Sequence, residues 1–243
     1  ATVRYFRELY FGLLDQSLTA FTLGVDYTPR DGVELSAAYG LETYGSFQRS
    51  RQANPGVQFT DQVPRESLLG GIQANNESAR DLSLYFHLPF CETLCWFCGC
   101  TTVITTQQSQ SAKYVEYLRK EIAQMATVLN PKRKVVQLHW GGGTPTFMKP
   151  AEIRELGQAI RDQFKFAADI EAGVEIDPRR ITPEHLSALR EAGFNGASIG
   201  VQDFDPAVQM AVNRIQSLEE TKLVMDAARE FGFQSISMDL IYG

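Results

Sequence analysis

The four cysteines of this 243-residue chain all lie within ten residues, at Cys91, Cys95, Cys98 and Cys100. Disulfides within one short loop would cross-link almost nothing, so clustered thiols favour metal ligation. A structural zinc site usually takes two pairs of ligands from separate segments, and only His87 lies near enough to add a local ligand. The C-x3-C-x2-C spacing of the first three cysteines suits a [4Fe–4S] cluster better, with one iron left open. Zinc remains the alternative.

The elements around the cysteines alternate between strands and helices. Short apolar runs predict strands over 82–88, 135–140, 173–176, 197–201 and 235–241. Apolar residues at steps of three and four predict helices over 114–129, 153–164 and 218–231, and Thr182-Pro183 predicts the start of another. This alternation is typical of an α/β fold with a parallel sheet, either doubly wound or curled into a barrel.

Polar residues gather where these strands are predicted to end. Glu175, Gln202 and Asp239 lie in or just after strands, and the run Gly141-Gly142-Gly143 directly follows one. Ligands of parallel α/β folds bind at the carboxyl ends of the strands. This placement indicates a binding site independently of the cysteines.

The first 45 residues follow a different pattern. Apolar and polar residues alternate over 21–27 and 33–41, on either side of the turn 29–32, which predicts an amphipathic β-hairpin. The hairpin either packs on a soluble domain or belongs to an outer-membrane barrel protein, in which case the chain is a fusion. We expect a hairpin segment over 1–45, a linker or N-terminal extension over 46–80, and the α/β core over 81–243.

The overall composition is that of a globular chain, with 44% hydrophobic and 21% charged residues. Lys plus Arg number 23 against 29 Asp plus Glu, and the net charge of −6 argues against a nucleic-acid partner. The sequence has no uncharged apolar run of about 18 residues and does not start with a secretion signal. We therefore expect a cytoplasmic protein whose core domain does not bind a membrane.

Six blocks of the chain resemble the oxygen-independent coproporphyrinogen III oxidase family of radical S-adenosylmethionine (SAM) enzymes. They are His87-Leu88-Pro89-Phe90-Cys91 with the cysteines that follow, and the segments 139–146, 175–179, 200–204, 213–214 and 239–243. The resemblance covers about 81–243 and implies a partial parallel (β/α)6-type barrel. It also implies that the carboxy-terminal domain covering the substrate is missing, so we expect a truncated core that is inactive by itself.

The same resemblance implies the cofactors and the residues that hold them. Cys91, Cys95 and Cys98 would bind a [4Fe–4S] cluster, whose open iron chelates SAM and delivers the electron that cleaves it to a 5′-deoxyadenosyl radical. Tyr85, Gly142 and Glu175 would contact this SAM. Members of the family accommodate a second SAM, which would be lined here by Phe97, Gly143, Thr144, Gln202, Arg214 and Asp239.

The implied reaction is the oxidative decarboxylation of coproporphyrinogen III to protoporphyrinogen IX in haem biosynthesis. The partners would be a tetrapyrrole substrate and an unidentified electron donor, and we expect a monomer. Cys100 favours the oxidase over the related haem-chaperone branch, which usually carries an aromatic residue there; haem binding and transfer is the alternative function. His87 either lies near the cluster or is structural.

Overall fold

The computed structural model describes three short N-terminal strands, a few residues near position 72, and the rest of the chain to residue 241. The described residues are 3–9, 21–27, 35–39, 70, 72–73, 76 and 80–241. The chain divides into two compact units, Ala1–Gly71 and Ile72–Gly243. Each unit is described by itself below.

The N-terminal unit contains a three-stranded antiparallel sheet. Its strands β1 (Val3–Leu9), β2 (Phe21–Tyr27) and β3 (Leu35–Tyr39) are ordered β1-β2-β3. β2 and β3 fall on the two strands expected from sequence, whereas β1 was not expected. The turn 29–32 lies outside the described residues, and the origin of the segment 1–45 and the linker 46–80 stay predictions.

The second unit is built on a five-stranded parallel sheet. Its strands are β4 (Leu82–Leu88), β7 (Lys134–Gly142), β8 (Lys165–Ile176), β9 (Gly196–Gln202) and β10 (Ser235–Leu240). All five predicted strands are present, and each pairs in parallel with the next along the chain. A doubly wound sheet reverses its strand order at a switch point, whereas a barrel wall does not. The α/β prediction is confirmed, and the strand order follows that of a barrel.

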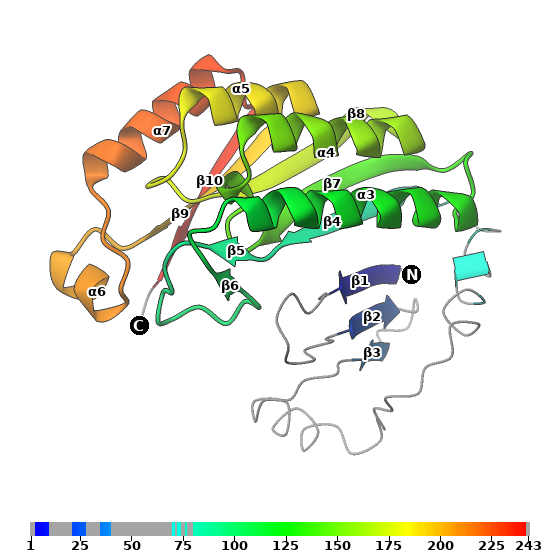
Figure 1. The fold of residues 1–243 in the computed structure, drawn as a ribbon, viewed down its shortest axis with the longest axis horizontal. Coiled ribbons are helices and arrows are strands. Elements are labelled where there is room, and N and C mark those ends of the chain that lie inside the picture. Colours follow the sequence, from blue (N-terminus) through cyan, green and yellow to red (C-terminus); the bar gives the residue numbers. More distant parts are fainter. Residues whose placement is uncertain are drawn as a thin grey trace. The chain divides into compact units, whose positions relative to one another are not determined.

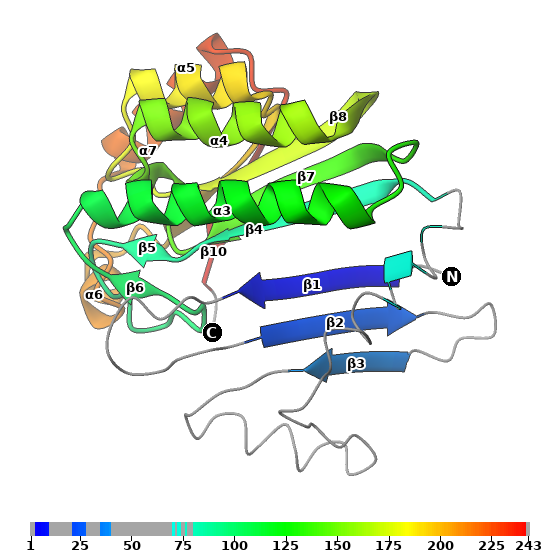
Figure 2. The ribbon, with the colours of Figure 1, turned by 45° about the vertical axis from the view of Figure 1, so that its right-hand side comes forward.

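Helices connect these strands and cover one face of the sheet (Figures 1 and 2). They are α3 (Ser109–Val128), α4 (Pro150–Gln163), α5 (Pro183–Ala192) and α7 (Leu218–Glu230), with a 3-10 turn at Pro145–Phe147. The short α6 (Pro206–Ala211) lies apart from this layer (Figure 1). Helix α5 begins as predicted, because the Thr182 side chain accepts a hydrogen bond from the backbone of His185. Helix α6 was missed, since six residues are too few to show a period.

Alternate residues of the central strands face two different environments. Trp140, Val174 and Ile199 are fully buried in the core beneath the helices. Their neighbours His139, Glu175 and Ser198 are only partly buried. Because successive strand residues point to opposite faces, the second face of the sheet carries the polar side chains. That face and the ends of its strands are where chemistry can take place.

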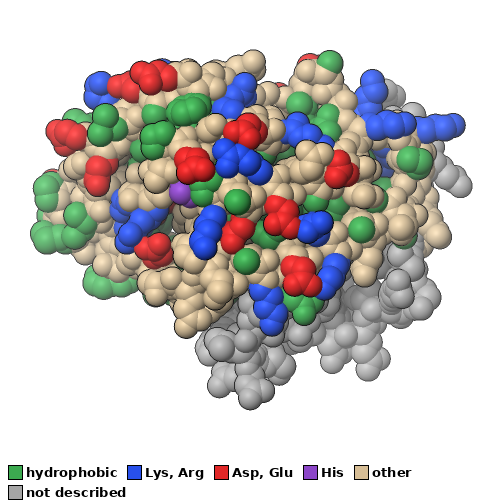
Figure 3. Space-filling view, turned by 45° about the horizontal axis from the view of Figure 1, so that its top comes forward, with side chains coloured by type: hydrophobic (Ala, Val, Ile, Leu, Met, Phe, Trp, Pro, Cys, Tyr) green, Lys and Arg blue, Asp and Glu red, His purple; other side chains and the backbone are tan. Residues whose placement is uncertain are grey.

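The helix-covered face shows acidic and basic side chains intermingled, with no large area of a single sign (Figure 3). Ion pairs link neighbouring helices there, for example Arg119 with Glu155 between α3 and α4, and Arg154 with Glu191 at 2.7 Å between α4 and α5. Exposed pairs of this kind contribute little stability. Among the described residues, no helix has the length and apolar character needed to span a bilayer.

Candidate functional site

A cavity of about 610 Å³ opens between the cysteine loop and the carboxyl ends of the strands. Eleven of the twelve site residues expected from sequence line it. They are Cys91, Cys95, Phe97, Cys98, Gly142, Gly143, Thr144, Glu175, Gln202, Arg214 and Asp239. These residues span about 150 positions of sequence, so the fold has brought them together. The cavity has the size of a small-molecule site.

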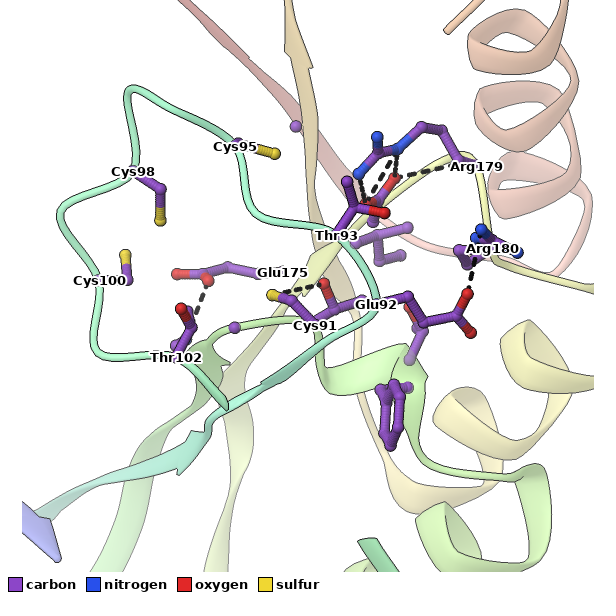
Figure 4. A pocket seen from close by; sticks show the side chains of 18 of the residues that line it. Cys91, Glu92, Thr93, Cys95, Cys98, Cys100, Thr102, Glu175, Arg179 and Arg180 are labelled. Atoms are coloured by element: carbon purple, nitrogen blue, oxygen red, sulfur yellow. Dashed lines mark hydrogen bonds and ion pairs between the residues drawn. The ribbon is translucent and has the colours of Figure 1, made fainter. Parts of the chain in front are cut away.

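The cysteine loop is closed at its base by a small parallel ladder. Strand β5 (Phe90–Cys91) pairs with β6 (Val103–Ile104), and the Thr105 backbone N–H donates to the Cys91 carbonyl at 2.9 Å. Figure 4 shows the thiols of Cys91, Cys98 and Cys100 turned toward the space that the loop encloses, together with the Glu175 carboxylate, whereas the Cys95 thiol points toward Arg179. The loop therefore presents several sulfur atoms to one volume.

The electrostatics of these thiols fit a metal cluster. Burial raises the pKa of Cys91, a hydrogen bond with Thr144 (3.5 Å) offsets part of this rise, and the nearby Cys98 adds to it. The neighbouring thiols thus add to the rise in the pKa of Cys91. Bound metal ions would lower this pKa, because they stabilise the thiolates that coordinate them. Within the described part of the chain, no three Cys, His, Asp or Glu side chains converge on a single-ion site. The residues present fit a cluster held by Cys91, Cys95 and Cys98.

Cys100 differs from the other thiols of the loop. Desolvation, and then the nearby Cys98, raise the pKa of Cys100 to about 11. Near pH 7 this side chain therefore stays a neutral thiol, although it is exposed at the cavity wall. The thiolate is the form that binds metal. The pKa of Cys91 is raised for the same main reason, so these shifts do not by themselves select the ligands of a cluster.

The glycine run after β7 makes room for close approaches within the chain. Gly142 has a φ of +116°, and a Cβ there would lie 2.6 Å from the His87 ring. A Cβ on Gly143 would lie 2.6 Å from the carbonyl oxygen of Pro89. The resemblance implies that Gly142 and Gly143 contact SAM. In the structure, the space that a side chain would need at these positions is taken by His87 and by the Pro89 carbonyl.

Glu175 connects the glycine run to an aromatic pair. One carboxylate oxygen accepts a hydrogen bond from the Gly142 backbone at 3.1 Å, and the other lies 3.3 Å from His139 Nε2. The Tyr85 ring stacks on His139 with centroids 5.8 Å apart and planes at 11°. Tyr85, the twelfth expected residue, does not line the cavity and reaches Glu175 through His139. Sequence reasoning gave His139 no role at this site.

Two of the residues expected around a second SAM, Gln202 and Asp239, lie at the ends of β9 and β10, and the others come from the cysteine loop, the segment after β7 and the segment after α6. Gln202 adopts a φ of +69°, an uncommon conformation for a residue other than glycine and one that is often found at functional sites. Asp239 accepts hydrogen bonds from Ser198 at 3.0 and 3.1 Å. The buried Arg214 is already engaged, since its Nη2 donates to the Gly200 carbonyl at 2.7 Å.

Two residues of the cavity wall, Asp177 and Arg179, were quoted in a matched block but given no role. Asp177 is buried and pairs with Arg179 at 2.6 Å and with Arg214 at 3.3 Å. Burial by itself would raise the pKa of Asp177, but these two arginines hold it below the ordinary value. A buried charge two residues after Glu175 was the signal that could have identified it.

Comparisons with known proteins agree with this geometry. The family model of the radical SAM superfamily matches residues 85–243. Oxygen-independent coproporphyrinogen III oxidases from Helicobacter pylori and Escherichia coli are 43% and 44% identical over 190 and 187 residues, in each case 77% of this chain. The chain covers only 42% and 40% of the lengths of these relatives.

A solved structure has the same fold. Coproporphyrinogen III oxidase from Escherichia coli, described as a radical SAM enzyme, superposes with a TM-score of 0.71 at 44% sequence identity. The match covers 77% of this chain and 43% of that one. With the family model covering well over half of the sequence, this chain belongs to the radical SAM superfamily.

Proposed function

We propose that the chain forms the cofactor-binding core of an oxygen-independent coproporphyrinogen III oxidase. The observation that carries the proposal is the single cavity in which three thiols, the glycine run and the strand-end polar residues meet. The relatives at 43% and 44% identity carry the name of this activity. The substrate would be a tetrapyrrole with propionate side chains.

In this proposal Cys91, Cys95 and Cys98 hold a [4Fe–4S] cluster, and SAM binds beside it. Bound together, the two groups supply a carbon-centred radical that can remove a hydrogen atom from an unactivated C–H bond. Glu175 would accept hydrogen bonds from the SAM ribose. His139 and the Gly142 N–H hold its carboxylate in place for this role. The cavity walls would hold the reacting groups in position and exclude water.

Each propionate would then become a vinyl group in a balanced step. The side chain gives one hydrogen atom from its β-carbon to the radical, releases its carboxylate as CO2, and passes the remaining electron to an acceptor. Two propionates would react in turn. A second SAM would be accommodated by Phe97, Gly143, Thr144, Gln202, Arg214 and Asp239, which lie along the same cavity.

The cellular compartment, the oligomeric state and the electron donor complete the proposal. We place it in the cytoplasm as a monomer that takes electrons from a separate donor. The four cysteines are free, and free clustered thiols suit a reducing compartment. The intermingled charges of the helix-covered face offer no extended basic surface to a nucleic acid (Figure 3).

Electron paramagnetic resonance of the anaerobically reconstituted, reduced chain tests the cofactor part of the proposal. We expect a [4Fe–4S] signal that changes when SAM is added, because the open iron binds it. The Cys95→Ser variant should lose most of its iron, whereas Cys100→Ser should retain it. A signal indifferent to SAM, or zinc in place of iron and sulfide, would contradict the proposal.

The substrate part is tested by incubating the reconstituted protein with SAM, a reductant and coproporphyrinogen III. Protoporphyrinogen IX, formed together with 5′-deoxyadenosine, is the expected product of the full-length enzyme. Stoichiometric haem binding without any protoporphyrinogen would instead indicate the haem chaperone. SAM cleavage without either result would leave a radical SAM enzyme that acts on another substrate.

A further inference from the structure

The cavity wall near Cys95 is built around a buried carboxylate. Asp177 is 7% exposed and accepts hydrogen bonds from Arg179 through Nε at 2.9 Å and Nη2 at 2.6 Å. Arg214, which is 8% exposed, places Nη1 at 3.3 Å from the same carboxylate. Within these three side chains one positive charge is in excess; the Glu220 carboxylate also interacts with Arg179, but it is exposed and therefore screened by water. We refer to Asp177, Arg179 and Arg214 as the Asp177 charge group.

Both arginines of this group reach the sulfur of Cys95. Nη1 of Arg214 lies 3.7 Å from Sγ, and the Arg179 guanidinium interacts electrostatically with the same thiol. In Figure 4 the Arg179 guanidinium lies beside the Cys95 part of the loop, away from Cys98 and Cys100. The excess positive charge is therefore directed at one particular cysteine.

The backbone on each side of Cys95 is held by the segment that carries Arg214. The Trp96 N–H donates to the Val212 carbonyl at 3.0 Å. Asn213 Nδ2 donates to the Leu94 carbonyl at 2.7 Å. Two anchors of the loop backbone and one side-chain contact thus keep Cys95 beside Arg214, although these two residues are 119 positions apart in sequence.

We propose that the Asp177 charge group raises the reduction potential of the cluster at its Cys95 corner, with Asp177 as the positioning residue that aims both arginines. The inference rests on the proposed function, because it requires a cluster bound to Cys95. A fixed positive charge stabilises the reduced cluster, which carries one more electron than the oxidised form. Burial strengthens the effect, since less water screens the charge, and net charge and hydrogen bonds to sulfur are known determinants of cluster potential.

Arg180, which follows Arg179 in the chain, provides a matched control. Arg180 lines the same cavity and carries the same charge, but it pairs with Glu92 at 3.0 Å and its side chain is 56% exposed. Its charge is therefore compensated by a carboxylate and screened by water. Loss of Arg180 should affect the cluster much less than loss of Arg179.

The test is a potentiometric titration of the anaerobically reconstituted chain, followed by electron paramagnetic resonance. Arg179→Gln should move the midpoint potential of the cluster to a more negative value than in the wild type. Arg179→Lys keeps the charge but loses the planar fork, so it should move the potential less. Arg180→Gln should leave the potential at the wild-type value. An unchanged potential in Arg179→Gln, or an equal change in Arg180→Gln, would overturn the inference.

Two further results separate the inference from the proposed function. A wild-type chain that takes up no iron and sulfide overturns the proposed function and the inference with it. A wild-type chain that carries a cluster whose potential ignores Arg179 overturns the inference alone. Should Arg179→Gln fail to fold, the uncharged Arg179→Met takes its place: a negative shift supports the role of Arg179, and an unchanged potential overturns the inference.

Discussion

Replacing Gly143 by alanine should move the first cysteine of the loop. No positive φ occurs at this position, so the backbone itself accepts alanine. A Cβ there would lie 2.6 Å from the Pro89 carbonyl oxygen and 2.8 Å from that of Phe90. Both are backbone atoms of the segment that leads into Cys91, so no side chain can rotate away to relieve the contact.

The size of the effect follows from the hydrogen bonds that hold this segment. Real Cβ atoms essentially never approach within 3.0 Å and ordinary contacts begin at 3.4 Å, so the segment must open by about 0.4–0.8 Å. The bonds from Gly143 N–H to the Leu88 carbonyl and from Thr144 N–H to the Phe90 carbonyl are both 2.8 Å long, and such an opening would weaken or break them. Losing both bonds would cost about 1–3 kcal/mol, which is also the usual cost of overpacking a well-packed site.

Urea unfolding of the cluster-free chain measures this cost, and iron content after reconstitution measures the displacement of Cys91. Gly99→Ala is the matched control, because a Cβ at Gly99 has no heavy atom within 4 Å. Its stability should stay within about 0.5 kcal/mol of the wild type. A Gly143→Ala chain as stable and as rich in iron as Gly99→Ala would refute the reasoning.

Three further predictions concern the carboxylates and the core. Glu175→Gln should weaken SAM binding to the reconstituted protein about tenfold or more in calorimetry, because a hydrogen bond to a charged group contributes about 1.5–3 kcal/mol; unchanged affinity would place the ribose elsewhere. Asp177→Asn should destabilise the chain at pH 7 by about 3–5 kcal/mol, since the buried Arg214 and the partly buried Arg179 lose their charged partner. The folded pKa of Asp177 is lowered, so the wild type loses this advantage as the pH falls below about 4, and the two unfolding curves should converge there. Trp140→Ala should cost about 3–5 kcal/mol in denaturant unfolding because Trp140 is fully buried against Phe194, whereas the 67% exposed Trp96 should tolerate alanine.

Local pattern was enough to predict the sheet and most of its helices. In four of the predicted strands alternate apolar residues pack under helices, as Trp140 and Val174 do, so the pattern reflects burial directly, whereas β10 packs only Ile236 against the core. Strand β8 nevertheless begins at Lys165, well before the predicted 173. The part before residue 173 carries Asp169 and Glu171, and such polar residues conceal a strand that is buried only toward its end.

The composition of the cavity could also be predicted, but the contacts within it could not. Cysteine spacing and strand-end polar residues indicated which side chains would gather. The approach of Arg214 to Cys95 joins residues 119 positions apart and depends on how α6 and the loop after it pack, which no local pattern encodes. For the same reason the sequence left Asp177 and His139 without roles, although both contact residues that it had selected.

Arg214, which the family resemblance selects as a ligand of a second SAM, also makes contacts within the protein. Its two Nη atoms contact Asp177, Cys95 and the Gly200 carbonyl, so the fork expected to bind a second SAM carboxylate is largely occupied. Its buried Nε, however, has no hydrogen-bond partner among the described residues. An unsatisfied buried donor costs about 1–3 kcal/mol, and a ligand oxygen that reached it would recover that free energy. A second SAM is therefore compatible with the Asp177 charge group only if its carboxylate approaches Arg214 from the Nε side or shares the Nη atoms with Asp177.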